Sequence, residues 1–238
     1  MSAKLGLVGR FIDILLTRRL WNLRSIAYST MQYAMFTVMR DIRGLAVKAL
    51  AIKLHEILGK EHETFASNDR LRVHQQNRYA LHRILARLTD HLETESGLPS
   101  RYLDYIAEGR KRYEVEHVWA NHYEQHTDEF DNAADFAEQR NRIGGLLLLP
   151  KSFNASYGDM TYEEKLPHYD SQNLLARSLG TPCYSHNPGF VKLKKDSGLP
   201  FKAHSHFKKA DMEKRSALYR QIAERIWNAD DLLGEVEP

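Results

Sequence analysis

The sequence predicts a mostly helical α+β fold, and three observations predict it. Apolar residues recur at helical spacing through the first 95 residues and again near the C-terminus. Segment 113–119 alternates apolar and polar residues, as a half-buried strand does. Segment 143–149 is an apolar run typical of a buried strand. We therefore expect two strands held between an N-terminal helical bundle and a C-terminal helix.

Residues 1–95 are expected to form a bundle of three or four helices. Apolar stripes at helical spacing cover segments 8–20, 26–39, 47–58 and 81–92. Gly59 closes the third of these helices. Ser67 or Asn68 could cap the fourth, and the Ser-Gly-Leu-Pro sequence at 96–99 breaks it.

The rest of the chain is expected to surround the two strands. A short helix around Tyr102–Lys111 would lead into the first strand. Segment 120–139 is polar and acidic, so we expect a loop with a helical turn. After the second strand we expect a turn, then helical material at about 160–178, a loop-like segment at 180–207 and a final helix at 208–228.

Composition limits the class of protein. The chain has 238 residues, 42% of them hydrophobic and 27% charged, which is ordinary for a globular protein. No apolar run approaches the roughly 20 residues that a membrane-spanning helix needs. The N-terminus lacks the charges and the cleavage site of a signal peptide. The single cysteine, Cys183, excludes an internal disulfide and a cysteine-rich zinc site, and fits a reducing, cytoplasmic setting.

Charge is distributed unevenly, although the formal net charge is only +3. Residues 1–60 hold ten Lys and Arg against three acids, and residues 190–209 hold six lysines against one acid. Residues 113–139 hold eight acids and no Lys or Arg. Basic flanks around an acidic, histidine-containing centre suit a protein that grips a polyanion and holds a cation. Solvated faces give the same pattern, and charge alone does not separate the two interpretations.

Two motifs could carry chemistry. The first strand contains the pair Glu116-His117, and the second runs into Lys-Ser-Phe-Asn at 151–154. Two strands followed by a helix can bring an acid, a histidine and an asparagine together, which is how a compact metal-dependent nuclease site is made. The alternative is a polar pair at a strand end in a non-catalytic α+β domain.

The order and spacing of these motifs resemble the HNH endonuclease domain at the C-terminus of GmrSD-type, modification-dependent restriction enzymes, including phosphorothioate-sensing relatives. Segment 116–121 is similar to the family's Glu-His-Ile-x-Pro-Gln motif, and segment 140–149 to its second strand, with Asn154 at the family's following asparagine. Segment 162–169 is similar to its Phe-x-x-Lys-x-x-x-Tyr helix, and segment 215–227 to its Arg-rich helix closing on Trp.

The resemblance implies a ββα-metal finger at roughly 113–178. It divides the chain into a helical bundle, an HNH nuclease core, and a basic loop with a C-terminal helix that packs on the core, at residues 1–95, 96–180 and 181–238. Two positions depart from the family pattern, because Ala120 replaces a proline and Gly145 replaces an asparagine.

The resemblance also implies roles for individual residues. His117 would be the general base, since an imidazole with an ordinary pKa near 6.5 accepts a proton at neutral pH, and a backbone carbonyl would orient it. Glu116 and the side-chain oxygen of Asn154 would hold one divalent ion, Mg²⁺ or Mn²⁺. Arg140 and Asn141 would support the site. Successive strand residues point to opposite faces, so Glu116 and His117 can share a site only if the strand twists or ends there.

Several further side chains are candidates for DNA or metal contacts. The lysines expected to contact phosphates are Lys151, Lys165, Lys192, Lys194 and Lys195. Lys165 could equally be a solvated helix lysine. His204 and His206 could form a metal pair on a strand, but no third ligand is near in the sequence.

The function that the resemblance implies is metal-dependent nicking or cleavage of double-stranded DNA, as the effector of an anti-phage restriction system in the bacterial cytoplasm, with no membrane contact. The chain has no P-loop. We expect it to be the C-terminal part of a longer protein with an N-terminal nucleotide-binding sensor domain. Two alternatives are a DNA-binding module with a decayed HNH site, suggested by Ala120 and Gly145, and a helical interaction scaffold.

Overall fold

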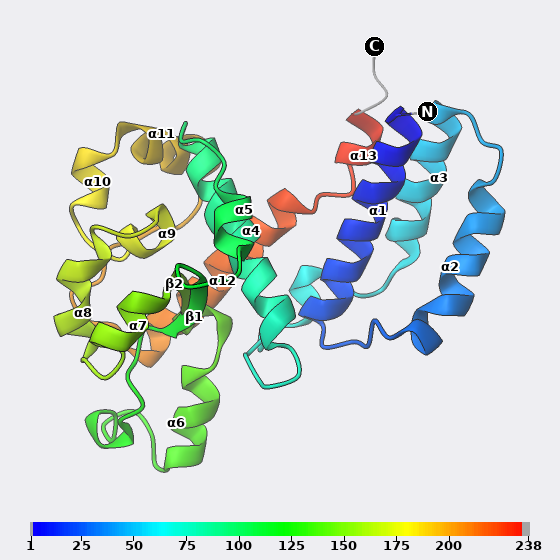
Figure 1. Ribbon diagram of the computed structural model, residues 1–238. Helices are drawn as coiled ribbons and strands as arrows, with labels where there is room; N and C mark the ends of the chain where they lie inside the picture. Colours follow the sequence, from blue (N-terminus) through cyan, green and yellow to red (C-terminus); the bar gives the residue numbers. More distant parts are fainter. Residues whose placement is uncertain (1, 235–238) are drawn as a thin grey trace. The chain divides into compact units, whose positions relative to one another are not determined.

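The computed structural model describes residues 2–234, which form two compact units. Among the described residues, the first comprises 2–71 and 223–234, and the second 72–222. The expected mostly helical α+β fold with a small sheet is confirmed (Figure 1). None of the described helices is both long enough and apolar enough to cross a membrane.

Helices packed on an aromatic centre make up the first unit. Its elements are α1 (Ser2–Trp21), α2 (Tyr28–Ile42), α3 (Val47–Lys60), the 3₁₀ turn η1 (Phe65–Ser67) and α13 (Asp231–Gly234). Trp21 packs edge-on against Phe65 at 5.3 Å, and Phe65 lies 5.8 Å from Trp227. The indole of Trp227 donates to Asp13 at 3.0 Å. Residues from both ends of the chain therefore share one core.

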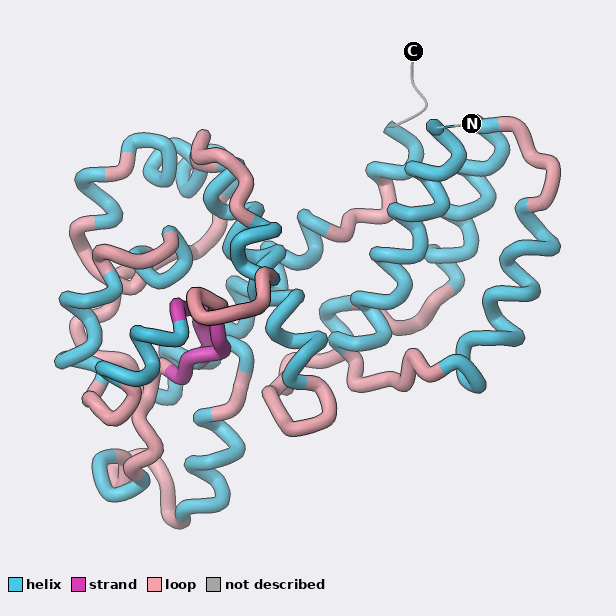
Figure 2. The backbone as a smooth tube through the Cα atoms, in the orientation of Figure 1, coloured by secondary structure: helices cyan, strands magenta, loops and turns pink. Residues whose placement is uncertain are grey.

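A two-stranded antiparallel sheet lies in the second unit (Figure 2, magenta). β1 (Tyr113–His117) pairs with β2 (Leu146–Pro150), with Tyr113 opposite Pro150 and His117 opposite Leu146. The four leucines of β2 are fully buried, which explains their continuous apolar run. Helix α4 (Arg78–Glu95) packs on β2, and α7 (Lys151–Tyr157) packs on both strands.

The remaining elements of the second unit surround this sheet. They are α5 (Tyr102–Ile106), η2 (Tyr123–Gln125), α6 (Ala133–Arg140), η3 (Ile143–Gly145), α8 (Tyr162–Tyr169), α9 (Leu174–Arg177), α10 (Cys183–His186), α11 (Pro188–Ser197) and α12 (Lys209–Ile226), whose last four residues count with the first unit.

The path of α12 explains the glycines before β2. A Cβ atom on Gly144 would overlap the backbone of Met212 and Ser216, and the Gly144 amide donates to the Ser216 hydroxyl at 3.1 Å. A Cβ atom on Gly145 would lie 2.6 Å from the Met212 methyl group. Met212 therefore fills the space next to Gly145. The GmrSD-type family that this sequence resembles has asparagine at that position.

Several boundaries differ from the expected ones. The helix expected after Ser67 or Asn68 begins only at Arg78, and it belongs to the second unit, not to a bundle ending at residue 95. The first strand ends at His117, and residues 143–145 form a 3₁₀ turn before the second strand. Segment 120–139 contains most of α6 in addition to a turn.

The expectation that segment 180–207 is loop-like is wrong, because it contains α10 and α11. Pro188 starts α11, and Gly198 ends it in the left-handed region at φ +66°. The backbone of α11 at Gly189 lies so close to the Ser96 carbonyl that a Cβ atom on this residue would overlap it, and this close approach anchors the helix. Phe190 is the buried side chain of α11. A lysine-rich helix with one buried side chain shows too little apolar periodicity to be detected from the sequence.

Candidate functional site

The alternation of β1 divides its side chains between two environments. Glu114 and Glu116 point to one face of the strand, whereas Val115 and His117 point to the other. Glu116 meets Lys165 of α8, and His117 meets Asn141 at the end of α6. The structure therefore gives the adjacent residues Glu116 and His117 different partners.

Glu116 and Lys165 form a buried ion pair. The Lys165 ammonium lies 2.6 Å from Oε1 of Glu116, and it also donates to the His117 carbonyl at 3.0 Å. The side chains are 0% and 6% exposed. Burial raises the pKa of Glu116 and lowers that of Lys165, and each charge opposes the shift of the other.

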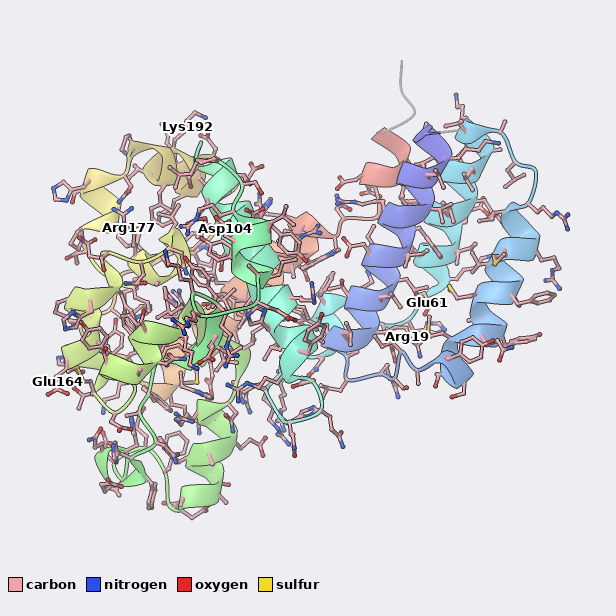
Figure 3. The ribbon with its side chains drawn as sticks, in the orientation of Figure 1. Arg19, Glu61, Asp104, Glu164, Arg177 and Lys192 are labelled. Carbon is pink, nitrogen blue, oxygen red and sulfur yellow. The ribbon has the colours of Figure 1, made fainter. Side chains whose placement is uncertain are left out.

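A capping box holds the helix that carries Lys165. The Thr161 side chain accepts from the Glu164 amide, and the Glu164 carboxylate accepts from the Thr161 amide at 2.8 Å. Glu164 itself is labelled in Figure 3. Because Lys165 follows the capping box directly, its position is tied to the first turn of α8.

His117 is oriented by a side-chain amide. Its Nε2 donates to Oδ1 of Asn141 at 2.8 Å, which leaves Nδ1 as the nitrogen that can accept a proton. The sequence suggested a backbone carbonyl in this role. Burial, reinforced by the Arg140 guanidinium, lowers the pKa of His117 to about 3. The imidazole is therefore neutral at neutral pH.

Arg140 and Asn141 also hold the surrounding backbone. Arg140 Nε donates to the carbonyls of Trp119 and Ala120 at 3.0 and 3.2 Å. The carbonyl of Asn141 accepts from the Val73 amide at 2.8 Å. Arg140 therefore contacts the segment that leads away from β1, and Asn141 contacts the imidazole at the end of β1.

Asn154 lies on α7, and its side chain is one of the groups that lower the pKa of Glu114. Partial burial opposes ionisation of Glu114, but Arg112, Asn154 and Lys151 together lower its pKa below the ordinary value. Arg112 lies at 2.8 and 2.7 Å from the same carboxylate oxygen, Oε1.

Oxygen donors of the kind that Mg²⁺ takes lie on β1 and α7. Asn154 Oδ1 is buried without a hydrogen-bond partner among the described residues, and Glu114 lies on β1. Glu116 follows two residues along the same face. Mg²⁺ binds through one or two carboxylates, takes other hard oxygen ligands and keeps several waters. Within residues 2–234, no group of three or more His, Cys, Asp or Glu side chains is arranged to hold a metal ion.

The expected phosphate-contacting lysines lie on different elements. Lys151 is exposed at the start of α7, close enough to influence Glu114. Lys192, labelled in Figure 3, is 79% exposed on α11 and pairs with Asp196. Lys194 lies over the Tyr184 ring at 5.0 Å. Lys165 is buried and paired, so its ammonium is not available to a phosphate in this structure.

His204 and His206 each pair with an acid. His204 lies 3.4 Å from Asp211, and His206 lies 2.9 Å from Glu163. Neither histidine is in a strand. The expectation that they form a metal pair on a strand therefore does not match their local structure.

Two features of the site were not predicted from the sequence. Glu114 was passed over, although the period-two alternation of β1 places it on the same face as Glu116. The burial of Lys165 was also missed, because lysine is almost never fully buried unless it is paired. The signal for that pairing was the acid Glu116 within a segment without basic residues.

Comparison with known protein families found a match. A family model described as GmrSD restriction endonucleases, C-terminal domain, matches residues 60–222, which is more than half of the chain. The matched segment includes β1, β2, α7 and α8, and therefore every side chain of the site described above. No curated protein and no solved structure matches the chain.

Proposed function

The chain belongs to the family of GmrSD restriction endonuclease C-terminal domains, and from this premise we propose that it nicks or cleaves double-stranded DNA through an HNH-type, metal-dependent site. Membership in the family indicates a function related to restriction endonucleases. The proposal adds the reaction type, the ion and the residues.

The observation that carries the proposal is the hydrogen bond that orients His117. A general base must be held in position with one nitrogen able to accept a proton. Asn141 fixes the tautomer in which Nδ1 can accept that proton. In the proposed reaction, Nδ1 takes a proton from the water that attacks the phosphorus. Arg140 holds the segment that follows His117 and so limits its movement.

A divalent ion, Mg²⁺ or Mn²⁺, would be held by oxygen donors from β1 and α7, where β1 ends at His117. The candidates are Asn154 and the carboxylates Glu114 and Glu116. When bound, such an ion neutralises charge on the scissile phosphate and stabilises the leaving oxygen. The order β1, β2, α7 along the chain supports a ββα-metal arrangement, since α7 packs on both strands.

The proposed setting is defence against phage in the bacterial cytoplasm. The chain would act as the effector, and an N-terminal nucleotide-binding sensor domain would recognise the invading DNA. Lys151 and the lysines of α11 would contact the DNA backbone, because exposed ammonium groups bind phosphates without regard to sequence.

The test is nicking of a supercoiled plasmid with Mg²⁺, with Mn²⁺ and with EDTA. We expect open-circular or linear product with either ion and none with EDTA. A DNA-binding module with a decayed site would retard DNA on a gel without cutting it, and a helical scaffold would do neither. Either of these results would overturn the proposal.

A further inference from the structure

We infer that the DNA backbone runs over segment 72–78 and Arg142, next to the proposed general base, and that the guanidinium groups of Arg78 and Arg142 bind its phosphates. The inference rests on the proposed nuclease function and names a surface on which the substrate lies. This surface is separate from the lysines of α11, which were expected from the sequence to contact DNA.

Asn141 connects His117 to the segment that precedes α4. Its side-chain Oδ1 accepts from His117 Nε2 at 2.8 Å, and its backbone carbonyl accepts from the Val73 amide at 2.8 Å. The chain neighbours of Val73 and Asn141 are Arg72 and Arg142, and these two arginines face each other in an antiparallel β-bridge. A ligand bound by Arg142 would therefore lie beside the residue that orients the imidazole.

The bridge places two cations opposite each other. Segment 72–78 contains two arginines and a histidine and no acid, and Arg142 adds a further positive charge. Like charges directly opposite each other on paired backbone segments are destabilising, so the two arginines of the bridge require anions nearby. Glu138 supplies one, since its carboxylate lies 2.6 Å from the guanidinium of Arg72.

Arg142 is the member of the bridge without such an acid. Its side chain is half-buried, its Nε atom is buried without a hydrogen-bond partner among residues 2–234, and no acid in this part of the chain pairs with it. Buried donors are nearly always satisfied by protein, water or a ligand. A guanidinium binds phosphate oxygens through parallel hydrogen bonds. A bound phosphate would therefore satisfy Nε and offset the repulsion between Arg142 and Arg72.

Asn77 holds the shape of the segment between the bridge and α4. Its Oδ1 accepts from the His74 amide, and its Nδ2 donates to the Arg72 carbonyl, both at 2.9 Å. Arg78 follows directly and is exposed at the first residue of α4. The segment thus presents an exposed arginine at one end and the arginine bridge at the other. Separate cations along a fixed segment suit a polyanion with repeated phosphates better than a single small anion.

The experiment measures binding of a labelled duplex by fluorescence anisotropy at several salt concentrations. All proteins carry His117→Ala, so that the duplex is not cut. The double variant Arg78→Gln/Arg142→Gln removes both charges, and Arg78→Lys/Arg142→Lys keeps them. The matched control is Arg110→Gln/Lys111→Gln, because these exposed residues precede β1, at the opposite end of the strand from His117.

We expect the double Gln variant to lose at least about tenfold in affinity. Its slope of log K against log salt should flatten by about two units, since each phosphate contact contributes roughly 0.9. The double Lys variant should keep most of the slope, because lysine binds phosphate as a point charge. The control should keep both affinity and slope. Circular dichroism checks that each variant folds. If the double Gln variant does not fold, the exposed Arg78→Gln alone should flatten the slope by about one unit.

A neutral phosphate analogue tests whether the contact lies beside His117. Here His117 is intact, and single methylphosphonates replace successive phosphates on either side of the mapped cut. At one or more of these positions the wild-type cleavage rate at limiting protein should fall about tenfold. The same replacement should have little further effect in the double Gln variant, because its contact is already lost.

The inference is overturned if the double Gln variant binds with the parent's affinity and slope, or if the Lys variant or the control loses as much slope as the Gln variant. It is also overturned if methylphosphonates slow wild type and the Gln variant alike. These results leave the proposed function intact as long as the wild-type chain cleaves plasmid DNA. A wild type that neither binds nor cleaves DNA would overturn both proposals.

Discussion

The ammonium of Lys165 lies 2.6 Å from the carboxylate of Glu116 in the interior of the second unit. A buried ion pair adds little net stability, because desolvation opposes the attraction between the charges. Loss of one partner is a different matter, since the remaining charge stays buried and unpaired. The pair should therefore show strong coupling when its members are changed singly and together.

We predict that Lys165→Met lowers the free energy of unfolding by about 3–5 kcal/mol. The double variant Lys165→Met/Glu116→Met should recover most of this loss, because it removes both charges. Urea denaturation followed by circular dichroism measures the effect. Lys192→Met is the control, since its exposed pair with Asp196 should contribute at most about 1 kcal/mol. A Lys165→Met protein as stable as wild type would contradict the buried pairing.

His117 and Asn141 give the prediction for catalysis. His117→Ala should lower the cleavage rate by about 10²–10⁴-fold while leaving DNA binding unchanged, because only the general base is lost. Asn141→Ala keeps the imidazole but removes its orienting partner, so its rate should fall by roughly 10–100-fold. Single-turnover cleavage of a plasmid measures both.

The control for this pair is His122→Ala, which removes a histidine that pairs with the exposed Glu124. It should cleave like wild type. Activity of His117→Ala within a few-fold of wild type would remove this residue from the mechanism.

The strands of the site were predictable, and the partners of its side chains were not. Alternation in 113–117 and the leucine run of 146–149 are local patterns, so the sequence located both strands to within a few residues. The same alternation indicated that the side chains of Glu116 and His117 point to opposite faces of the strand. The partner of each depends on residues distant in sequence, Lys165 and Asn141.

The helices of the second unit show a similar limit. Segment 81–92 has a long apolar stripe and was correctly expected to be helical. In α11 the only buried side chain is Phe190, and close contact of Gly189 with Ser96 anchors the helix. Such backbone contacts leave no periodic signal, so α11 was taken for a loop.

Gly145 and Met212 give a prediction about packing. Gly145→Asn would place the resembling family's residue against the Met212 methyl group, which lies 2.6 Å from the position of the new Cβ atom. We expect a loss of about 1–3 kcal/mol in the free energy of unfolding. Met212→Ala added to Gly145→Asn should recover part of it, because it opens the space. Urea denaturation measures the change in the free energy of unfolding for each single variant and for the double variant. If the two single changes add up to the double one, residues 145 and 212 do not interact.

Cys183 should react slowly and only at high pH. Burial raises the pKa of its thiol to about 11, and the side chain is fully buried. Because the thiolate is the nucleophile, alkylation by iodoacetamide should keep rising with pH instead of levelling off near 9. The raised thiol pKa stabilises the folded state at pH values below the pKa of the thiol in the unfolded chain. This contribution to stability is lost as the pH rises toward 11. Complete labelling within minutes at pH 8 in native protein would contradict the burial; labelling in urea is the positive control.

DNA binding should weaken with salt through the lysines of α11. Replacing Lys192, Lys194 and Lys195 together with Gln should lower affinity for all duplex sequences alike, because these contacts would be made to the backbone. The slope of log K against log salt should flatten by about one to three units, since each phosphate contact contributes roughly 0.9. Fluorescence anisotropy at several salt concentrations measures both quantities.

The matched variant replaces Lys48, Lys53 and Lys60 of α3 with Gln, which removes the same charge from the first unit. If DNA contacts α11, this variant keeps most of the wild-type slope. If the α11 variant instead binds with unchanged affinity and slope while the α3 variant loses both, the lysines of α11 form only a solvated face. The DNA would then run over the basic N-terminal helices, where residues 1–60 carry ten Lys and Arg against three acids.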